Sequence, residues 1–209
     1  MRTKALISVV AVAAMVGGAL VVSAGAAAPA PAFVQQVSAH AGGVTSLAVT
    51  PSSAVVSGDR LVVETGVWNS AGSTMGSVTD SAGDTFTELL HFKASDNTEM
   101  SVWTAPVSAG GGTRPVITAK PTAKADVGVV ALEYSGLSTV ADATVLDQTS
   151  HASGTTGASG ATVASTATPA TTAANELAVG FYTDSGFGDT LGAGTGWTSR
   201  ANISGTGDM

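Results

Sequence analysis

Apolar and polar residues alternate along most of the chain in short runs, and this spacing is typical of β-strands. Gly, Pro, Asp or Ser bounds each run, and no stretch keeps the period of about 3.6 residues that an amphipathic helix requires. The pattern predicts an all-β fold, an antiparallel β-sandwich of the Ig-like or jelly-roll-like kind. The strongest runs are RLVVETGVW (60–68), TFTELLHFK (85–93), TEMSVWTAP (98–106), RPVITAK (114–120), DVGVVALEYSG (126–136) and ELAVGFYTD (176–184). Weaker runs are VTSLAVT (44–50), VLDQT (145–149), ATVAST (161–166) and GWTSRAN (196–202).

Residues 1–32 follow another pattern. Arg2 and Lys4 come before an apolar run over residues 5–22, and small residues with several A-x-A sites follow. This order is that of a secretory signal peptide, whose apolar part forms a helix. We therefore expect residues 1–32 to be a cleaved leader and residues 33–209 to be a single secreted β-sandwich domain. Because the apolar run is long for a leader, an uncleaved membrane anchor is the alternative.

The segment HASGTTGASGATVASTATPATTAA (151–174) has low complexity. Such a composition alone is typical of a flexible linker. Residues 175–209, which follow it, are too few to fold alone without disulfides or metal. We therefore predict that residues 151–174 form a long loop, containing one exposed edge strand, inside the single domain.

The end of the chain leads to a further expectation. Asp208 and Met209 are typical of the start of another strand, and ELAVGFYTD is apolar on both faces, as suits an interior strand. We expect the natural chain to continue beyond Met209. These residues alone would then leave a sheet edge uncovered beside residues 126–136, 176–184 or 196–203.

Composition and charge narrow the range of partners. The chain has 26 Gly and only 11% charged residues, which suits short strands and turns. Its net charge is −7, and the expected leader contains two of the 8 basic residues and none of the 15 acidic ones. The other basic residues are scattered, so we expect no nucleic-acid partner and no membrane partner once the leader is cleaved. Because the chain has no Cys, burial rather than disulfides must stabilise it.

Three carboxylates lie close together in SVTDSAGDTFTE (77–88), at Asp80, Asp84 and Glu88. They could bind a cation or act as an acid–base pair. However, Asp80 can accept hydrogen bonds from backbone N–H groups two residues on, and Gly83 can adopt the positive φ of a turn followed by a bulge. The alternating oxygen ligands of a calcium loop are absent from the sequence. We therefore predict a turn, with no metal site and no cofactor.

The sequence contains no familiar catalytic motif. His40, His91 and His151 are far apart, and neither a G-x-S-x-G nor an H-E-x-x-H motif occurs. We expect His91 to be an ordinary sheet histidine, because it alternates with other residues of a predicted strand. We predict that the chain is not an enzyme. A secreted hydrolase whose site is assembled from distant residues is the alternative.

A Gly-rich stretch, DSGFGDTLGAGTGW (184–197), follows a predicted strand. It lacks the Lys of a phosphate-binding loop, and no helix pattern comes after it. A long connection is the better interpretation. The functional alternative is a cation or polyol site lined by Asp184 and Asp189, because binding residues on such scaffolds tend to lie in loops.

Large aromatic side chains fall on the less apolar face of three predicted strands. By the two-residue period of a strand, the aliphatic residues of each one point to the opposite face. If the three faces coincide, the rings form a platform that stacks on sugar, as in many secreted binding modules. Packing inside the second sheet of the sandwich is the alternative. The predicted ligand-binding residues are Trp68, Trp103 and Tyr182.

Four motifs, in the order SVTDSAGDTFTEL, EMSVWTAPVSAGGGT, VVALEYSGL and ANELAVGFYTDSGFGDTL, resemble a β-sandwich domain of exported actinobacterial and phage-associated proteins. The resemblance spans most of residues 33–209. It implies an Ig-like, non-catalytic fold, which is commonly found as an accessory module, rather than an activity. We therefore expect a secreted, non-catalytic module of the cell surface or extracellular matrix, with a polysaccharide or a cell-surface protein as partner.

Overall fold

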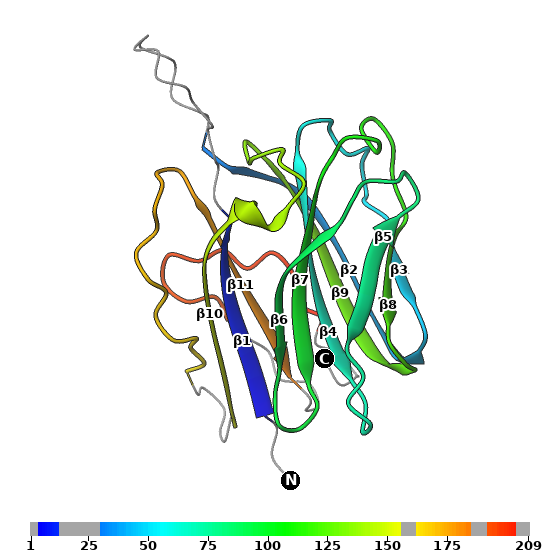
Figure 1. Ribbon diagram of the computed structural model, residues 1–209, viewed down its shortest axis with the longest axis vertical. Helices are drawn as coiled ribbons and strands as arrows, with labels where there is room; N and C mark the ends of the chain where they lie inside the picture. The colour runs from blue at the N-terminus through cyan, green and yellow to red at the C-terminus, as the bar shows by residue number, and fades with distance from the viewer. Residues whose placement is uncertain (1–3, 13–29, 156–161, 185–191, 204–209) are drawn as a thin grey trace.

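The computed structural model describes residues 4–12, 30–155, 162–184 and 192–203. Over these residues the chain forms eleven β-strands and one short 3₁₀ helix, η1 (Ala143–Val145), and no α-helix. The strands pair antiparallel in three sheets, which Figure 1 shows side by side as layers. The predicted all-β fold, an antiparallel β-sandwich, is therefore confirmed.

Sheet B is the middle layer, and its strand order is β2-β9-β4-β7-β6 (Figure 1). Nearly every residue of the three inner strands is buried. A strand is buried in this way only when both faces of its sheet are covered. The strands are β2 (Ala32–Val44), β9 (Ala125–Ser135), β4 (Arg60–Trp68), β7 (Glu99–Pro106) and β6 (Thr87–Lys93).

Sheet C covers one face of sheet B. It consists of β3 (Leu47–Val49), β8 (Ile117–Pro121) and β5 (Met75–Asp80), in that spatial order. Alternate residues of the inner strands of sheet B, such as Val63 and Val129, pack against Ile117 of β8 in one apolar cluster. Removal of this apolar surface from water is the main term that stabilises the two layers.

Sheet A covers the other face of sheet B with β10 (Leu146–Thr155), β1 (Lys4–Val12) and β11 (Leu177–Asp184). Val62 and Val102, on the second face of sheet B, pack with Val179 of β11 in a separate apolar cluster. The sequence did not predict this third layer. Within the described residues β11 pairs with β1 alone, so it lies at an edge of the sheet.

The strand predictions succeed where the runs are strongest. The six strong runs correspond to β4, β6, β7, β8, β9 and β11. Two of the weaker runs, ATVAST (161–166) and GWTSRAN (196–202), are wrong as strands. Residues 162–166 and 196–202, which are the described parts of these runs, contain no strand. In the predicted loop 151–174, residues 151–155 belong to β10, residues 162–174 contain no strand, and residues 156–161 lie outside the described part.

The helix expected in the leader is wrong for its described part, because Lys4–Val12 is strand β1. The sequence KALISVVAV is rich in β-branched residues, which favour a strand. Pairing with β10 on one side and β11 on the other supplies the backbone partners that a helix would find within itself. Residues 1–3 and 13–29 lie outside the described residues, and cleavage of the leader stays a prediction.

Candidate functional site

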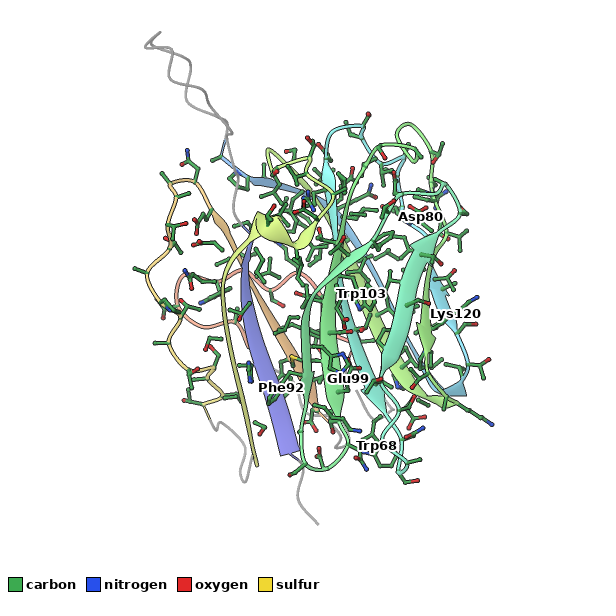
Figure 2. The ribbon with its side chains drawn as sticks, in the orientation of Figure 1. Trp68, Asp80, Phe92, Glu99, Trp103 and Lys120 are labelled. Atoms are coloured by element: carbon green, nitrogen blue, oxygen red, sulfur yellow. The ribbon has the colours of Figure 1, made fainter. Side chains whose placement is uncertain are left out.

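Trp68 and Trp103 lie on opposite faces of sheet B. Trp103 pairs with Val63 across β7 and β4, and both residues pack against the core between sheets B and C. Trp68 ends β4 on the alternate face, and its Nε1 donates a hydrogen bond to the backbone oxygen of Asp96 at 3.2 Å. Figure 2 shows Trp103 in the upper half of β7 and Trp68 near the lower end of β4. The two rings therefore share no platform.

Tyr182 lies in sheet A, on the face of β11 that points away from sheet B. Val179 packs in the core between the two sheets, so the two-residue period directs Gly180 and Tyr182 outward. The structure thus does not bring Tyr182 together with Trp68 or Trp103. The period of a strand assigns residues to its two faces, but it does not reveal that sheet B is covered on both of them.

A different aromatic residue, Trp197, packs on the outward face of β11 at Gly180, two residues from Tyr182. A β-carbon built on Gly180 would be 3.4 Å from Cζ3 of Trp197, so the ring packs on the bare backbone of β11. The side chain is nevertheless 44% exposed. The hydroxyl of Tyr182 donates to Oδ2 of Asp184 at 3.0 Å, which helps to fix the position of its ring. We call Trp197, Tyr182 and Asp184 the outer-face site.

The sequence does not single out Trp197, because this residue ends a Gly-rich stretch whose pattern predicts a long connection. One signal could have found it. Gly180 interrupts an otherwise apolar strand, and a Gly inside a strand often marks a place where another group approaches closely. The alternative site predicted at Asp184 and Asp189 has only Asp184 among the described residues, because Asp189 lies outside them.

The carboxylates of the DSAGD stretch shape the backbone. Oδ1 of Asp80 accepts hydrogen bonds from the backbone N–H groups of Ala82, Gly83 and Asp84 at 3.0, 2.7 and 3.1 Å. Gly83 has a φ of 92°, a conformation that residues with a side chain rarely adopt. The predicted turn is confirmed, and Figure 2 shows Asp80 near the end of β5.

Asp84 connects this turn to a second loop. Its Oδ1 accepts from the N–H groups of Ser108 and Ala109 at 2.8 and 2.7 Å, and its Oδ2 accepts from the N–H of Gly110 at 3.1 Å. Burial alone would raise the pKa of Asp84, but these hydrogen bonds outweigh burial and lower the pKa. Asp84 therefore anchors a loop as an ionised carboxylate.

Glu88, the third carboxylate, belongs to a separate cluster on β6 and β7. Nδ1 of His91 lies 3.0 Å from Oε1 of Glu88 and 3.4 Å from Oε1 of Glu99. Glu99 is fully buried, and this desolvation raises its pKa to about 8 although the N–H of Met75 donates to its Oε2. At neutral pH Glu99 is therefore mostly a protonated carboxylic acid, and the side chains of Glu88 and His91 lie beside it on β6.

One hydroxyl group of these two strands is a candidate nucleophile for the cluster. Ser101 pairs with His91 across the sheet, but its Oγ is buried. This hydroxyl lies 2.7 Å from Oγ1 of Thr65 and accepts a hydrogen bond from Nε1 of Trp103 at 2.9 Å. The described parts of the chain also contain no group of three or more His, Asp or Glu residues that could bind a metal ion.

Comparisons with known proteins find no match to a protein family model, to a curated protein or to a solved structure. Within the four described ranges, no helix has the length and apolar character needed to cross a bilayer. The outer-face site and the Glu88–His91–Glu99 cluster must therefore be judged by their own geometry.

Proposed function

We propose that this chain is an exported, non-catalytic β-sandwich module of the cell surface or extracellular matrix, and that it binds polysaccharide through the outer-face site. The observation that carries this proposal is the half-exposed indole of Trp197, which packs on Gly180 two residues from Tyr182. An indole whose position is fixed in advance loses little conformational entropy when a sugar ring stacks on it.

The polar groups of the site suit a sugar. The hydroxyl of Tyr182 donates a hydrogen bond to the carboxylate of Asp184, which is buried, and this bond holds the phenol ring on the strand that Trp197 covers. A few polar groups beside an apolar surface are typical of a small-molecule site that fixes the orientation of its ligand. Because the chain has a net charge of −7 and Asp184 is part of the site, the ligand class is a neutral glycan rather than an anionic one.

The non-catalytic part of the proposal rests on the use of the carboxylates. Asp84 accepts hydrogen bonds from one loop. The carboxylate of buried Glu133 accepts two hydrogen bonds within the protein. Its Oε1 accepts from the backbone N–H of Val56 at 2.7 Å, and its Oε2 accepts from Nε2 of the Gln35 side chain at 2.6 Å. These side chains shape the backbone around the sheets and are not presented to a substrate.

Export is tested by the intact mass of material secreted by a host that carries the complete gene. The proposal expects a mature chain that begins between Gly25 and Phe33, which matches the A-x-A sites of the sequence. A secreted or membrane-bound product that still contains residues 1–22 would contradict cleavage.

Glycan binding is tested on an array of neutral and anionic polysaccharides, with the hits measured by titration. We expect binding to neutral glycans and at least a tenfold loss, about 1.4 kcal/mol, for Trp197→Ala. Val56→Ala is the matched control, because Val56 is another exposed hydrophobic residue, at 53%. Equal loss in both variants, or no neutral hit, would refute the glycan site.

A further inference from the structure

The middle strand of sheet A comes from the segment that the sequence predicts to be removed. β1 pairs antiparallel with β10 from Lys4 to Val12 and with β11 from Ala5 to Val12. β10 and β11 are both neighbours of β1 and do not pair with each other in the described part of the sheet (Figure 1). Loss of β1 would therefore expose two facing rows of backbone N–H and C=O groups.

These two rows would define a slot one strand wide. Neighbouring strands lie about 4.8 Å apart, so β10 and β11 are separated by about twice that distance. Closing the slot would require one of them to move across sheet B. Each side of the slot is anchored in the same apolar cluster, β11 by Val179 and the segment entering β10 by Val145 and Leu146.

A second observation concerns the face of sheet B that sheet A covers. Glu64 of β4 alternates with Val62, so it points to the face of sheet B that sheet A covers. Its side chain is buried, and its Oε1 has no hydrogen-bond partner among the described residues. A buried acceptor without a partner destabilises the folded state.

We propose that the slot between β10 and β11 is an acceptor site for an extended strand of another protein, and that residues 4–12 occupy this site only until the leader is removed. The proposal rests on the predicted cleavage. The inserted strand runs antiparallel to both neighbours, is mostly apolar, and carries a hydrogen-bond donor side chain towards Glu64. Backbone hydrogen bonds on two edges provide affinity, and alternate side chains provide specificity.

The experiment uses the folded full-length chain with a specific protease site placed within residues 13–29. After cleavage, a labelled peptide of residues 4–12 is added in excess, and its 1:1 incorporation is measured together with hydrogen exchange of β10 and β11. We expect the peptide to replace the cut segment and to maintain protection of both strands. A peptide with Val9→Pro, which lacks a backbone donor at a paired position, should bind at least tenfold more weakly.

Two results would overturn the acceptor site. One is that the peptide is not incorporated although the cut protein remains folded. The other is that β10 and β11 stay protected after the cut segment has been washed away, since this would show that the slot closes. A cut protein that forms a dimer protected at both strands would show a second copy as occupant and would refute a foreign strand.

The predicted hydrogen bond from the inserted strand to Glu64 is tested with three peptides of residues 4–12, each of which has one residue replaced by Lys. The substitutions are at the positions that pair with alternate residues of β11, namely Leu6→Lys, Ser8→Lys and Val10→Lys, opposite Thr183, Phe181 and Val179. We expect one of them to bind at least tenfold more tightly to the wild type than to Glu64→Leu. Equal affinities for the two proteins in all three cases would refute a donor to Glu64.

Discussion

A β-carbon added to Gly180 would lie 3.4 Å from Cζ3 of Trp197, so the indole packs directly on the backbone of β11. Because Gly has no side chain, residue 180 controls where this ring lies. The proposed glycan site therefore depends on a residue that would itself make no contact with the glycan.

Replacement of Gly180 by Val should displace the indole of Trp197 and weaken neutral-glycan binding at least tenfold. Stability should change by less than about 1 kcal/mol, because Gly180 is exposed and Val favours a strand. The matched control is Gly154→Val in β10, where an added β-carbon meets nothing within 4 Å. Titration with glycan and urea denaturation measure the two effects, and retention of full affinity in Gly180→Val would contradict the role of the contact.

Trp68→Ala and Trp103→Ala should separate packing from binding. Both side chains are half-buried, so each substitution should cost roughly 2 to 4 kcal/mol of unfolding free energy, somewhat below the usual cost for a fully buried tryptophan. Glycan affinity of the folded fraction should be unchanged, because neither ring lies at the outer-face site. A stable Trp103→Ala variant that no longer binds glycan would instead restore the platform predicted from the sequence.

The strands were predictable because each strong run carries a local signal of its own, as in the Gly- and Asp-bounded run that became β4. The layer arrangement was not. Glu64 and Glu99 made their strand faces look half-polar, and yet both residues are buried because sheet B is covered on two sides. The position of Trp197 depends on its contact with Gly180 of β11. The two-residue period of a strand cannot predict a contact with a residue outside that strand.

β2 shows the same limit in another form. Residues 32–44 begin at the last residue of the expected leader and include a Gly pair, so no local pattern predicts a long strand there. The strand forms because β9 pairs with it from Ala32 to Val44, with register shifts near both ends. Pairing of this kind is tertiary, and it overrides a weak local preference.

Asp84→Ala should destabilise the protein by about 2 to 4 kcal/mol, because a buried donor left without a partner costs about 1 to 3 kcal/mol. Asp142→Ala is the control, since the exposed Asp142 caps the three-residue η1 and its loss should destabilise the protein much less. Denaturation with urea measures both values.

If Asp80 and Asp84 instead bound a cation, EDTA would lower the melting temperature of the wild type, and we expect no such change.

The pH dependence follows from the lowered pKa of Asp84. In the unfolded chain this carboxyl has an ordinary pKa, so its contribution to stability is complete above the ordinary range and is lost as the pH falls through the folded pKa. Acid should therefore destabilise the wild type more than Asp84→Asn. Urea denaturation at a series of acidic pH values measures the difference, and parallel curves for the two proteins would contradict it.

Glu64 should change the stability of the protein with pH in the direction opposite to Asp84. Desolvation raises its pKa from 4.5 to about 8. The folded state therefore retains a proton that the unfolded chain releases between these values, so this residue makes the protein less stable as the pH rises from about 5 to 8. Glu64→Leu should remove part of the slope and stabilise the protein at pH 8 by about 1 to 3 kcal/mol. Urea denaturation at pH 5, 7 and 9 measures the slope, and an unchanged slope would show that Glu64 is paired in solution.

The central claim, that the outer face of sheet A binds a neutral glycan, is tested most directly by calorimetric titration of wild type, Trp197→Phe and Trp197→Ala with the best array hit. The account predicts that Trp197→Phe keeps part of the glycan affinity, because a smaller ring can still stack on the sugar. Trp197→Ala should bind the glycan at least tenfold more weakly, with an unchanged melting temperature. Equal affinity in all three proteins would contradict the account.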